Sequence, residues 1–270
     1  LLVAVPVLIQ ALNALRVKSC DPWRGLSFLA LGPWLSVSLA AVCGATLGVS
    51  IRSTALATWS AALLPFVALV RPLYDFLSTP GIFAFGHFFG YFPGTFYDRR
   101  VDVPDAWLSH RALSAAVGFG LWAFMASSRQ PRSGMIVVAG PRRNPVLGGI
   151  AVVTAVAALL VARQGEELGH HTSGAFIASK LGRVIQGPRC TLVVPRELNV
   201  TASMRLAEDC AFHVQALEQT LGVQERETIT AYFFRSPQEK RALMGAMRVY
   251  IAKPWRREVY LQQADFPHPV

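Results

Sequence analysis

The chain has 270 residues, of which 53% are hydrophobic and only 16% are charged, and its formal net charge is +10. Soluble domains carry about 25% charged residues, so this composition argues against an ordinary soluble protein and predicts a membrane portion. The charge is uneven, because residues 1–162 hold 12 Lys/Arg and 5 Asp/Glu whereas residues 163–270 hold 14 and 11. Two regions in different solvents are therefore expected.

Apolar segments predict a membrane region of about five helical spans over residues 1–163. The longest has no charge over 26 residues, which at about 1.5 Å per residue is enough to cross a hydrocarbon core of roughly 30 Å. Because the first segment begins inside an apolar run without Met or a basic flank, we expect the chain to be a fragment at its N-terminus. The predicted spans are 1–15, 26–51, 54–70, 106–127 and 146–162.

The orientation of these spans follows from the basic residues in short loops. The loop 129–144 carries four arginines and no acidic residue, so it is predicted to be cytoplasmic. The last span then leads outward, and the C-terminal domain is predicted to be periplasmic, in a multi-pass protein of the inner membrane whose first partner is the lipid bilayer. The loop with Arg16, Lys18 and Arg24 disagrees, since five spans would place it outside as well.

An aromatic stretch, 83–97, lies within the loop 72–105. It holds eight Phe and Tyr rings in fifteen residues, broken by Gly and Pro, and so cannot form a regular spanning helix. The simplest interpretation is an interfacial loop, and the alternatives are a re-entrant loop lining a cavity or a platform under the outer domain. His87 within it is a candidate ligand or proton carrier, although a lone loop histidine is more often neither.

Residues 164–270 alternate between helical and strand patterns and predict a small extracytoplasmic α+β domain. Strands are expected at 190–195, 228–234 and 258–262, and helices at 173–181 and 202–221, each ended by a glycine. Ser236, Pro237 and Glu239 form a capping-box start for one more helix.

The evidence for a metal site in this domain is weak. His170 and His171 follow Glu166 and Glu167, but adjacent side chains point apart, so a polar linker is the preferred interpretation. The chain has four cysteines without a C-x-x-C pair, which argues against a cysteine zinc site. Cys190 and Cys210 could form a disulfide outside the cytoplasm, and two free buried thiols are the preferred alternative.

Nucleic acid is not an expected partner. A charge of +7 comes from the membrane part, where loop arginines have a topological explanation, and no nucleic-acid motif is present. The basic patch 253–257 is predicted to be a surface turn that faces anionic headgroups. A phosphate-binding glycine loop and a G-x-S-x-G elbow are also absent from the sequence.

The C-terminal segment resembles the region just before the zinc helix of gluzincin-type metallopeptidases, closest to bacterial membrane-anchored members of the peptidase MA group. The likeness covers roughly residues 180–270. In that family a strand, a short helix and an edge strand precede a helix with H-E-x-x-H, whose histidines bind zinc and whose glutamate activates water. The segments that carry it are Tyr232–Arg241, Leu243–Ala246, Glu258–Leu261 and Phe266–Val270.

The resemblance implies that this is the N-terminal part of a membrane-anchored zinc metallopeptidase, acting on a peptide or protein substrate. Zinc is expected for the full-length protein and not for this chain, because H-E-x-x-H is missing from its residues and His268 stands alone between prolines. No catalytic residue or metal ligand is therefore assigned. The edge strand that would contact substrate is predicted at Glu258, Val259, Tyr260, Leu261 and Gln262.

A second hypothesis comes from another class of protein. The chain could be a non-catalytic membrane transport or sensing component whose outer domain binds a ligand or partner. Ionisable residues inside the spans would favour it, because such groups usually mark a pathway through the membrane. The sequence offers only His110 and Arg111, near one end of a predicted span.

Overall fold

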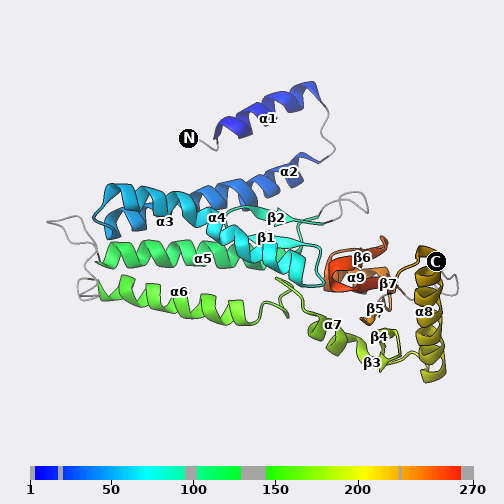
Figure 1. Cartoon of the computed structure of the whole chain (residues 1–270). Coiled ribbons are helices and arrows are strands. Elements are labelled where there is room, and N and C mark those ends of the chain that lie inside the picture. Colours follow the sequence, from blue (N-terminus) through cyan, green and yellow to red (C-terminus); the bar gives the residue numbers. More distant parts are fainter. Residues whose placement is uncertain (1–3, 18–20, 95–101, 129–143, 225–226, 263–270) are drawn as a thin grey trace. The chain divides into compact units, whose positions relative to one another are not determined.

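The computed structural model describes residues 4–17, 21–94, 102–128, 144–224 and 227–262 (Figure 1). The chain separates into two compact units. Unit 1 comprises Leu1–Leu73, Phe85–Phe92 and Val101–His170, and unit 2 comprises Tyr74–Ala84, Pro93–Arg100 and His171–Val270. The division after His170 lies close to the predicted boundary at residue 163, but the segment Tyr74–Ala84 belongs with the C-terminal unit.

Unit 1 is helical apart from one hairpin. Helix α5 packs against α6 on one side and against α3 on the other, and α5 and α6 run side by side (Figure 1). Its helices are α1 (Ala4–Arg16), α2 (Pro22–Leu29), the π-helical segment η1 (Ala30–Trp34), α3 (Leu35–Ser50), α4 (Thr54–Ser78, whose last turn lies in unit 2), α5 (Asp105–Ser128) and α6 (Pro145–Arg163).

Local sequence explains several of these boundaries. The Asp21 side chain accepts a hydrogen bond from the Arg24 amide and Pro22 follows it, which starts α2. Asn144 and Pro145 start α6 in the same way. Pro33 lies inside η1, where it removes a backbone donor and widens the helix to a π turn.

Among the described residues, three helical segments are long and apolar enough to cross a membrane: Pro22–Ser50, Thr54–Ser78 and Pro145–Arg163. Their side chains are largely exposed; on α4, for example, Leu63, Phe66 and Val67 are each more than half exposed. The predicted membrane portion thus has helices of the required kind. Helices α1 and α5, which the sequence also predicts as spans, are not among these three. The loop 129–143, on which the predicted orientation rests, lies outside the described residues.

The aromatic stretch contains a short hairpin, β1 (Ala84–Gly86) and β2 (Gly90–Phe92). Gly90 has a φ of +83°, a conformation that glycine adopts without strain. The expectation that this stretch does not form a spanning helix is confirmed for its described part.

Unit 2 is built on a five-stranded mixed sheet in the order β3-β4-β5-β7-β6. The three central strands run parallel, and the two edge strands, β3 and β6, are antiparallel to their neighbours. The prediction of a C-terminal domain that combines helices with a sheet is confirmed, although its parallel central strands are the arrangement of an α/β rather than an α+β fold. The elements are α7 (Gly174–Leu181), β3 (Gly182–Gln186), β4 (Cys190–Pro195), α8 (Val200–Leu221), β5 (Ile229–Phe234), α9 (Pro237–Met244), β6 (Ile251–Lys253), η2 (Pro254–Arg256) and β7 (Glu258–Gln262).

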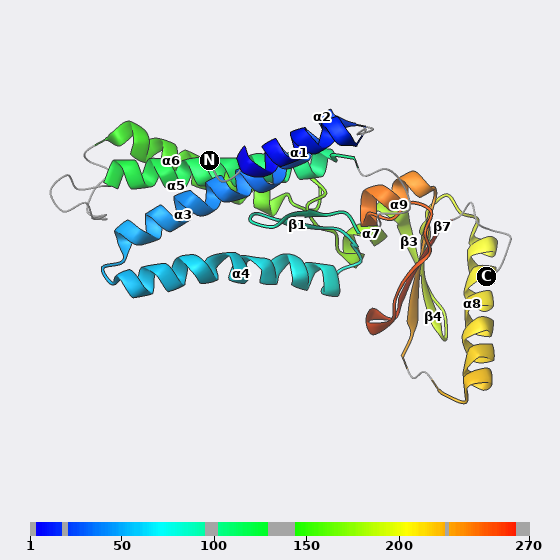
Figure 2. The ribbon, with the colours of Figure 1, turned by 90° about the horizontal axis from the view of Figure 1, so that it is seen from above.

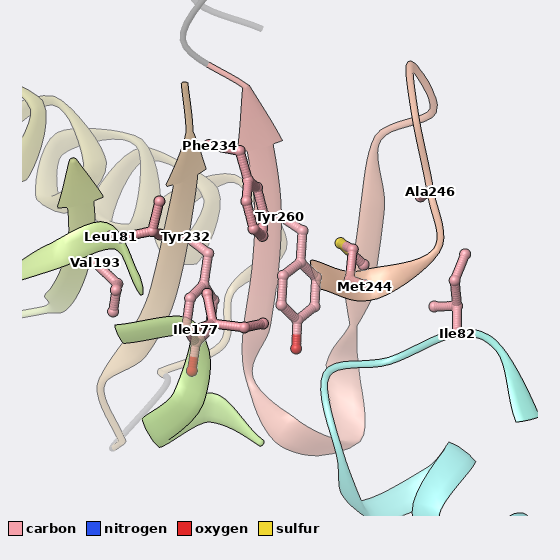
Figure 3. Close-up of a cluster of buried hydrophobic side chains, with 9 residues drawn as sticks. All are labelled: Ile82, Ile177, Leu181, Val193, Tyr232, Phe234, Met244, Ala246 and Tyr260. Carbon is pink, nitrogen blue, oxygen red and sulfur yellow. The ribbon is translucent and has the colours of Figure 1, made fainter. Parts of the chain in front are cut away.

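The two faces of this sheet bury different cores. Tyr232, Phe234 and Tyr260 pack with residues of α7 and α9 on one face (Figure 3). On the other face, along which α8 lies (Figure 2), Leu192 and Phe233 pack with Ala207 of that helix. Because successive side chains of a strand point to opposite faces, neighbouring residues of the central strands enter different cores, one on each helix-covered face.

The chain after α4 contributes to the first core. Ile82 belongs to the same buried cluster as Met244 and Tyr260 (Figure 3), and its amide donates to the Met244 carbonyl at 2.9 Å. A segment far away in sequence thereby becomes part of the C-terminal unit, which the sequence pattern does not reveal.

A disulfide joins Cys190 in β4 to Cys210 in α8, with Cα atoms 6.2 Å apart. The preferred prediction of two free thiols is wrong, and the disulfide alternative is correct. The bridge links α8 covalently to β4 on the sheet face that α8 covers, and it closes a loop between two residues that are 20 apart in sequence.

Candidate functional site

The five residues predicted to contact substrate form β7, but β7 is not an edge strand. It pairs with β5 on one side and with β6 on the other. Glu258, for example, lies between Thr230 of β5 and Lys253 of β6. The expected edge position of 258–262 is therefore wrong. The edge on this side of the sheet is β6, a three-residue strand that ends at Lys253 and is too short to stand out in the sequence. Substrate contact by Glu258–Gln262 stays a prediction.

Alternate residues of β7 face the core that contains Tyr232. Glu258, Tyr260 and Gln262 are buried, whereas Val259 and Leu261 are half-buried. The Tyr260 hydroxyl donates to the Glu258 carboxylate, and the Arg256 guanidinium pairs with the same carboxylate at 2.6 Å. The polar groups of Glu258 and Tyr260 are thus used inside the unit, whereas Gln262 Oε1 is buried without a partner among the described residues.

The tyrosines next to this carboxylate are held in their neutral form. Burial, followed by the hydrogen bond to Glu258, raises the pKa of Tyr260 well above its ordinary value. Burial and then the Glu258 charge raise the pKa of Tyr232 to about 12. The two rings are stacked, with centroids 5.1 Å apart, so the two tyrosines contribute to packing and neither phenol ionises near neutral pH.

The basic segment that starts at Lys253, the last residue of β6, caps the C-terminal end of α4. The Lys253 ammonium donates to the carbonyls of Phe76, Thr79 and Gly81, each at 2.7 Å. The carbonyls of Leu77 and Ser78 accept from the Trp255 indole and the Arg256 guanidinium. The last carbonyls of a helix lack partners within the helix and carry partial negative charge, so three donors from one short segment stabilise this end.

The predicted surface turn at 253–257 is therefore wrong for Lys253, of which only 2% is exposed. Burial, with the nearby Arg256 charge, lowers the pKa of Lys253 to about 8. The last turn of α4 and the sheet edge are joined by this segment within unit 2.

Unit 1 contains a buried arginine whose guanidinium makes several hydrogen bonds. Arg111 of α5 is 1% exposed, and its N–H groups donate to five neutral acceptors. The acceptors are the carbonyl oxygens of Leu31, Gly32, Gly86 and His87 and the hydroxyl oxygen of Ser36. The π turn and the hairpin are thus both fastened to α5, and the charge has no carboxylate partner in the described part of the chain.

Three histidines lie around this arginine. The His87 and His110 rings are stacked with centroids 4.5 Å apart, and the His170 ring meets His110 edge-on at 5.3 Å. Ser114 is 2.8 Å from His87 Nδ1, and Ser109 is 2.8 Å from His170 Nε2. His110 Nδ1 is buried without a partner among the described residues. Burial, and then the Arg111 charge, lower the pKa of His87.

These histidines do not make a metal centre. No group of three or more His, Cys, Asp or Glu side chains within the described ranges could hold a metal ion. The zinc implied by the resemblance also finds no H-E-x-x-H among the 270 residues. The residues present do not fit a zinc site.

The sequence-predicted candidates separate in space. His170 joins the cluster in unit 1, whereas His171 is the first residue of the C-terminal segment of unit 2. The two neighbouring histidines therefore belong to different units. His87, His110 and Arg111 come together, which the sequence did not indicate, because the hairpin and α5 are distant along the chain. The one sequence signal for this cluster was the ionisable pair His110 and Arg111 inside an otherwise apolar helix.

A cavity of about 570 Å³ lies in unit 1 beside the Arg111 network, bounded by α2, η1, α3, the hairpin and Trp107 of α5. Ser36 and Gly32, both acceptors for Arg111, also line it. The full lining is Gly25, Phe28, Leu29, Gly32, Pro33, Ser36, Val37, Phe88, Phe89, Gly90, Tyr91 and Trp107. The aromatic hairpin thus lines a cavity, as one of the sequence alternatives expected.

No family model matches this sequence, and comparisons with curated proteins and with solved structures give no significant match.

Proposed function

We propose that this sequence is the membrane-anchored, substrate-side part of a zinc metallopeptidase of gluzincin type. The observation that carries the proposal is the order of elements in unit 2: strand β5, short helix α9 and the antiparallel edge strand β6. That is the order which precedes the zinc helix in the family that the sequence resembles. The edge strand is β6, in place of residues 258–262.

An edge strand can pair with an extended peptide, because its outward backbone groups have no neighbouring strand. In the part of the chain that the structure describes, no strand pairs with the outer side of β6. We therefore propose Ile251–Lys253 as the segment along which a peptide substrate lies. The fixed register between β6 and β7 would hold that edge rigid.

The sheet face that carries α8 also supports the proposal that a further helix follows β7. Helix α8 packs on β3 and β4, while Val259 and Leu261 of β7, on that same face, are only half-buried. An apolar sheet face is stable when another element covers it. A helix that follows β7 and bears H-E-x-x-H would fill this place.

The residues following Val270 in the gene give the first test, and H-E-x-x-H is expected there. The second test uses the longer protein in detergent with a quenched fluorescent peptide library. Cleavage that a chelator abolishes and added zinc restores is expected. The matched variant is Ala252→Pro, which should lower cleavage while leaving zinc content unchanged, because proline prevents regular strand pairing. Absence of the motif, or cleavage unaffected by chelation, would contradict the proposal.

We further propose that the protein is a multi-pass inner-membrane protein of about five spans with unit 2 in the periplasm. The arginine-rich segment 129–144 supports a cytoplasmic loop before α6. The Cys190–Cys210 disulfide supports an oxidising compartment for unit 2.

Cysteine labelling tests this orientation. In a chain with Cys20 and Cys43 replaced by serine, Ala175→Cys should react with a membrane-impermeant maleimide on cells with a permeabilised outer membrane. Met135→Cys should react only after the inner membrane is opened. Equal access of both positions from the cytoplasmic side would rule the orientation out.

A transport or sensing component is the second candidate, favoured by the buried Arg111 and its three histidines. Buried ionisable groups in a membrane region commonly mark a functional pathway. The peptide assay separates the two candidates, because a transport or sensing component would cleave no peptide and would need no zinc.

A further inference from the structure

The cavity in unit 1 has the size and lining of a ligand pocket. Its volume of about 570 Å³ lies within the range of roughly 300–1,000 Å³ typical of small-molecule sites. Phe28, Leu29, Val37, Phe88 and Phe89 supply an apolar lining. Few polar side chains join them, which suits a ligand that is mostly hydrocarbon.

One buried polar group of this lining has no partner. Trp107 is 1% exposed, and its indole N–H finds no acceptor within the described ranges. The ring itself is fixed, because it stacks on Phe28 at 5.0 Å and packs against Tyr91 at 5.4 Å between centroids. A buried donor without an acceptor is costly, so an acceptor atom of a ligand in the cavity would satisfy it.

The glycines of the wall leave the space open. A Cβ atom placed at Gly25 or at Gly32 would meet nothing within 4 Å. Both residues line the cavity, so neither glycine is required by a close contact with a neighbouring element. Their lack of a side chain instead preserves volume beside the aromatic residues.

We propose that this cavity binds one membrane glycerophospholipid, with an acyl chain against the apolar lining and an ester carbonyl accepting the Trp107 N–H. The helices of the same unit expose long apolar side chains, as on α4 and α6, and so belong in a bilayer where such lipids are the abundant amphiphiles. An ester carbonyl lies at the boundary between chain and headgroup, where tryptophan is also favoured.

Native mass spectrometry of the 270-residue chain tests the site, with dioleoyl phosphatidylethanolamine as the probe. The purified protein should retain one lipid under conditions that strip the others. Gly32→Leu and Gly25→Leu fill the cavity and should abolish this retention. Gly48→Leu is the matched control, because a Cβ there also meets nothing within 4 Å but Gly48 does not line the cavity; it should retain the lipid.

Trp107→Phe keeps the ring and removes only the donor, so lipid affinity should fall roughly tenfold, as expected for loss of one buried hydrogen bond. Retention unchanged in both filled variants, equal loss in Gly48→Leu, or unchanged lipid affinity of Trp107→Phe would each overturn the proposal. Two independent filled positions guard against a single variant that fails to fold.

Discussion

Replacing Arg111 with methionine is expected to lower the free energy of unfolding by more than about 4 kcal/mol, the range reached when a buried network is broken. Methionine keeps the helix propensity and most of the volume, so the loss comes from the hydrogen bonds. Four backbone carbonyls and the Ser36 hydroxyl would lose a charged donor, and hydrogen bonds to charged groups contribute about 1.5–3 kcal/mol each.

Thermal unfolding in detergent, followed by tryptophan fluorescence, measures this effect. Arg111→Lys should also be strongly destabilised, because an ammonium has three donors for five acceptors and lacks the planar fork. Arg163→Met, at the exposed end of α6, is the control and should change the free energy of unfolding by less than about 0.5 kcal/mol. Similar unfolding temperatures for Arg111→Met and wild type would contradict the role assigned to Arg111.

Removing the disulfide is expected to destabilise unit 2 by about 3 kcal/mol. The bridge joins residues that are 20 apart in sequence, and closing a loop of this length restricts the unfolded chain by about that amount. The double variant Cys190→Ala/Cys210→Ala should unfold at a lower urea concentration and lose protease resistance in α8, whose link to β4 is cut.

Cys43→Ala is the matched control, because Cys43 is a free cysteine. Alkylation supplies an independent readout: of the four cysteines, Cys190 and Cys210 should react in denatured protein only after reduction. Immediate reaction of all four without reductant would show that the bridge is absent, and would also remove the support it gives to a periplasmic location.

Local structure in unit 2 was predictable where the residues themselves impose it. Ser173 and Ser236 each accept from the amide three residues further on, and Gly182, Gly222 and Gly245 end helices in the left-handed region. β-branched and aromatic runs marked β4, β5 and β7. The edge strand β3 was missed because none of its five residues is buried, so it lacks the apolar run of the central strands. The edge strand β6 was missed because three residues are too few to show a period.

The errors share one cause. Residues 258–262 were expected at the edge because the preceding three-residue strand β6 was not seen, and pairing order is a property of the folded sheet. Lys253 was assigned to the surface because a lysine beside Trp and Arg usually is, yet the end of α4 supplies three carbonyls for it. The Arg111 cluster combines segments that lie 24 to 80 positions apart.

The sequence by itself determined the long apolar helices, the combination of helices and strands in residues 164–270 and most helix ends, since hydropathy, strand alternation and capping act over a few neighbouring residues. Only the tertiary structure decided which strand is the edge, whether Cys190 and Cys210 pair and which acceptors surround Arg111. Those features depend on contacts between distant segments, where burial obliges every polar group to find a partner wherever the fold places one.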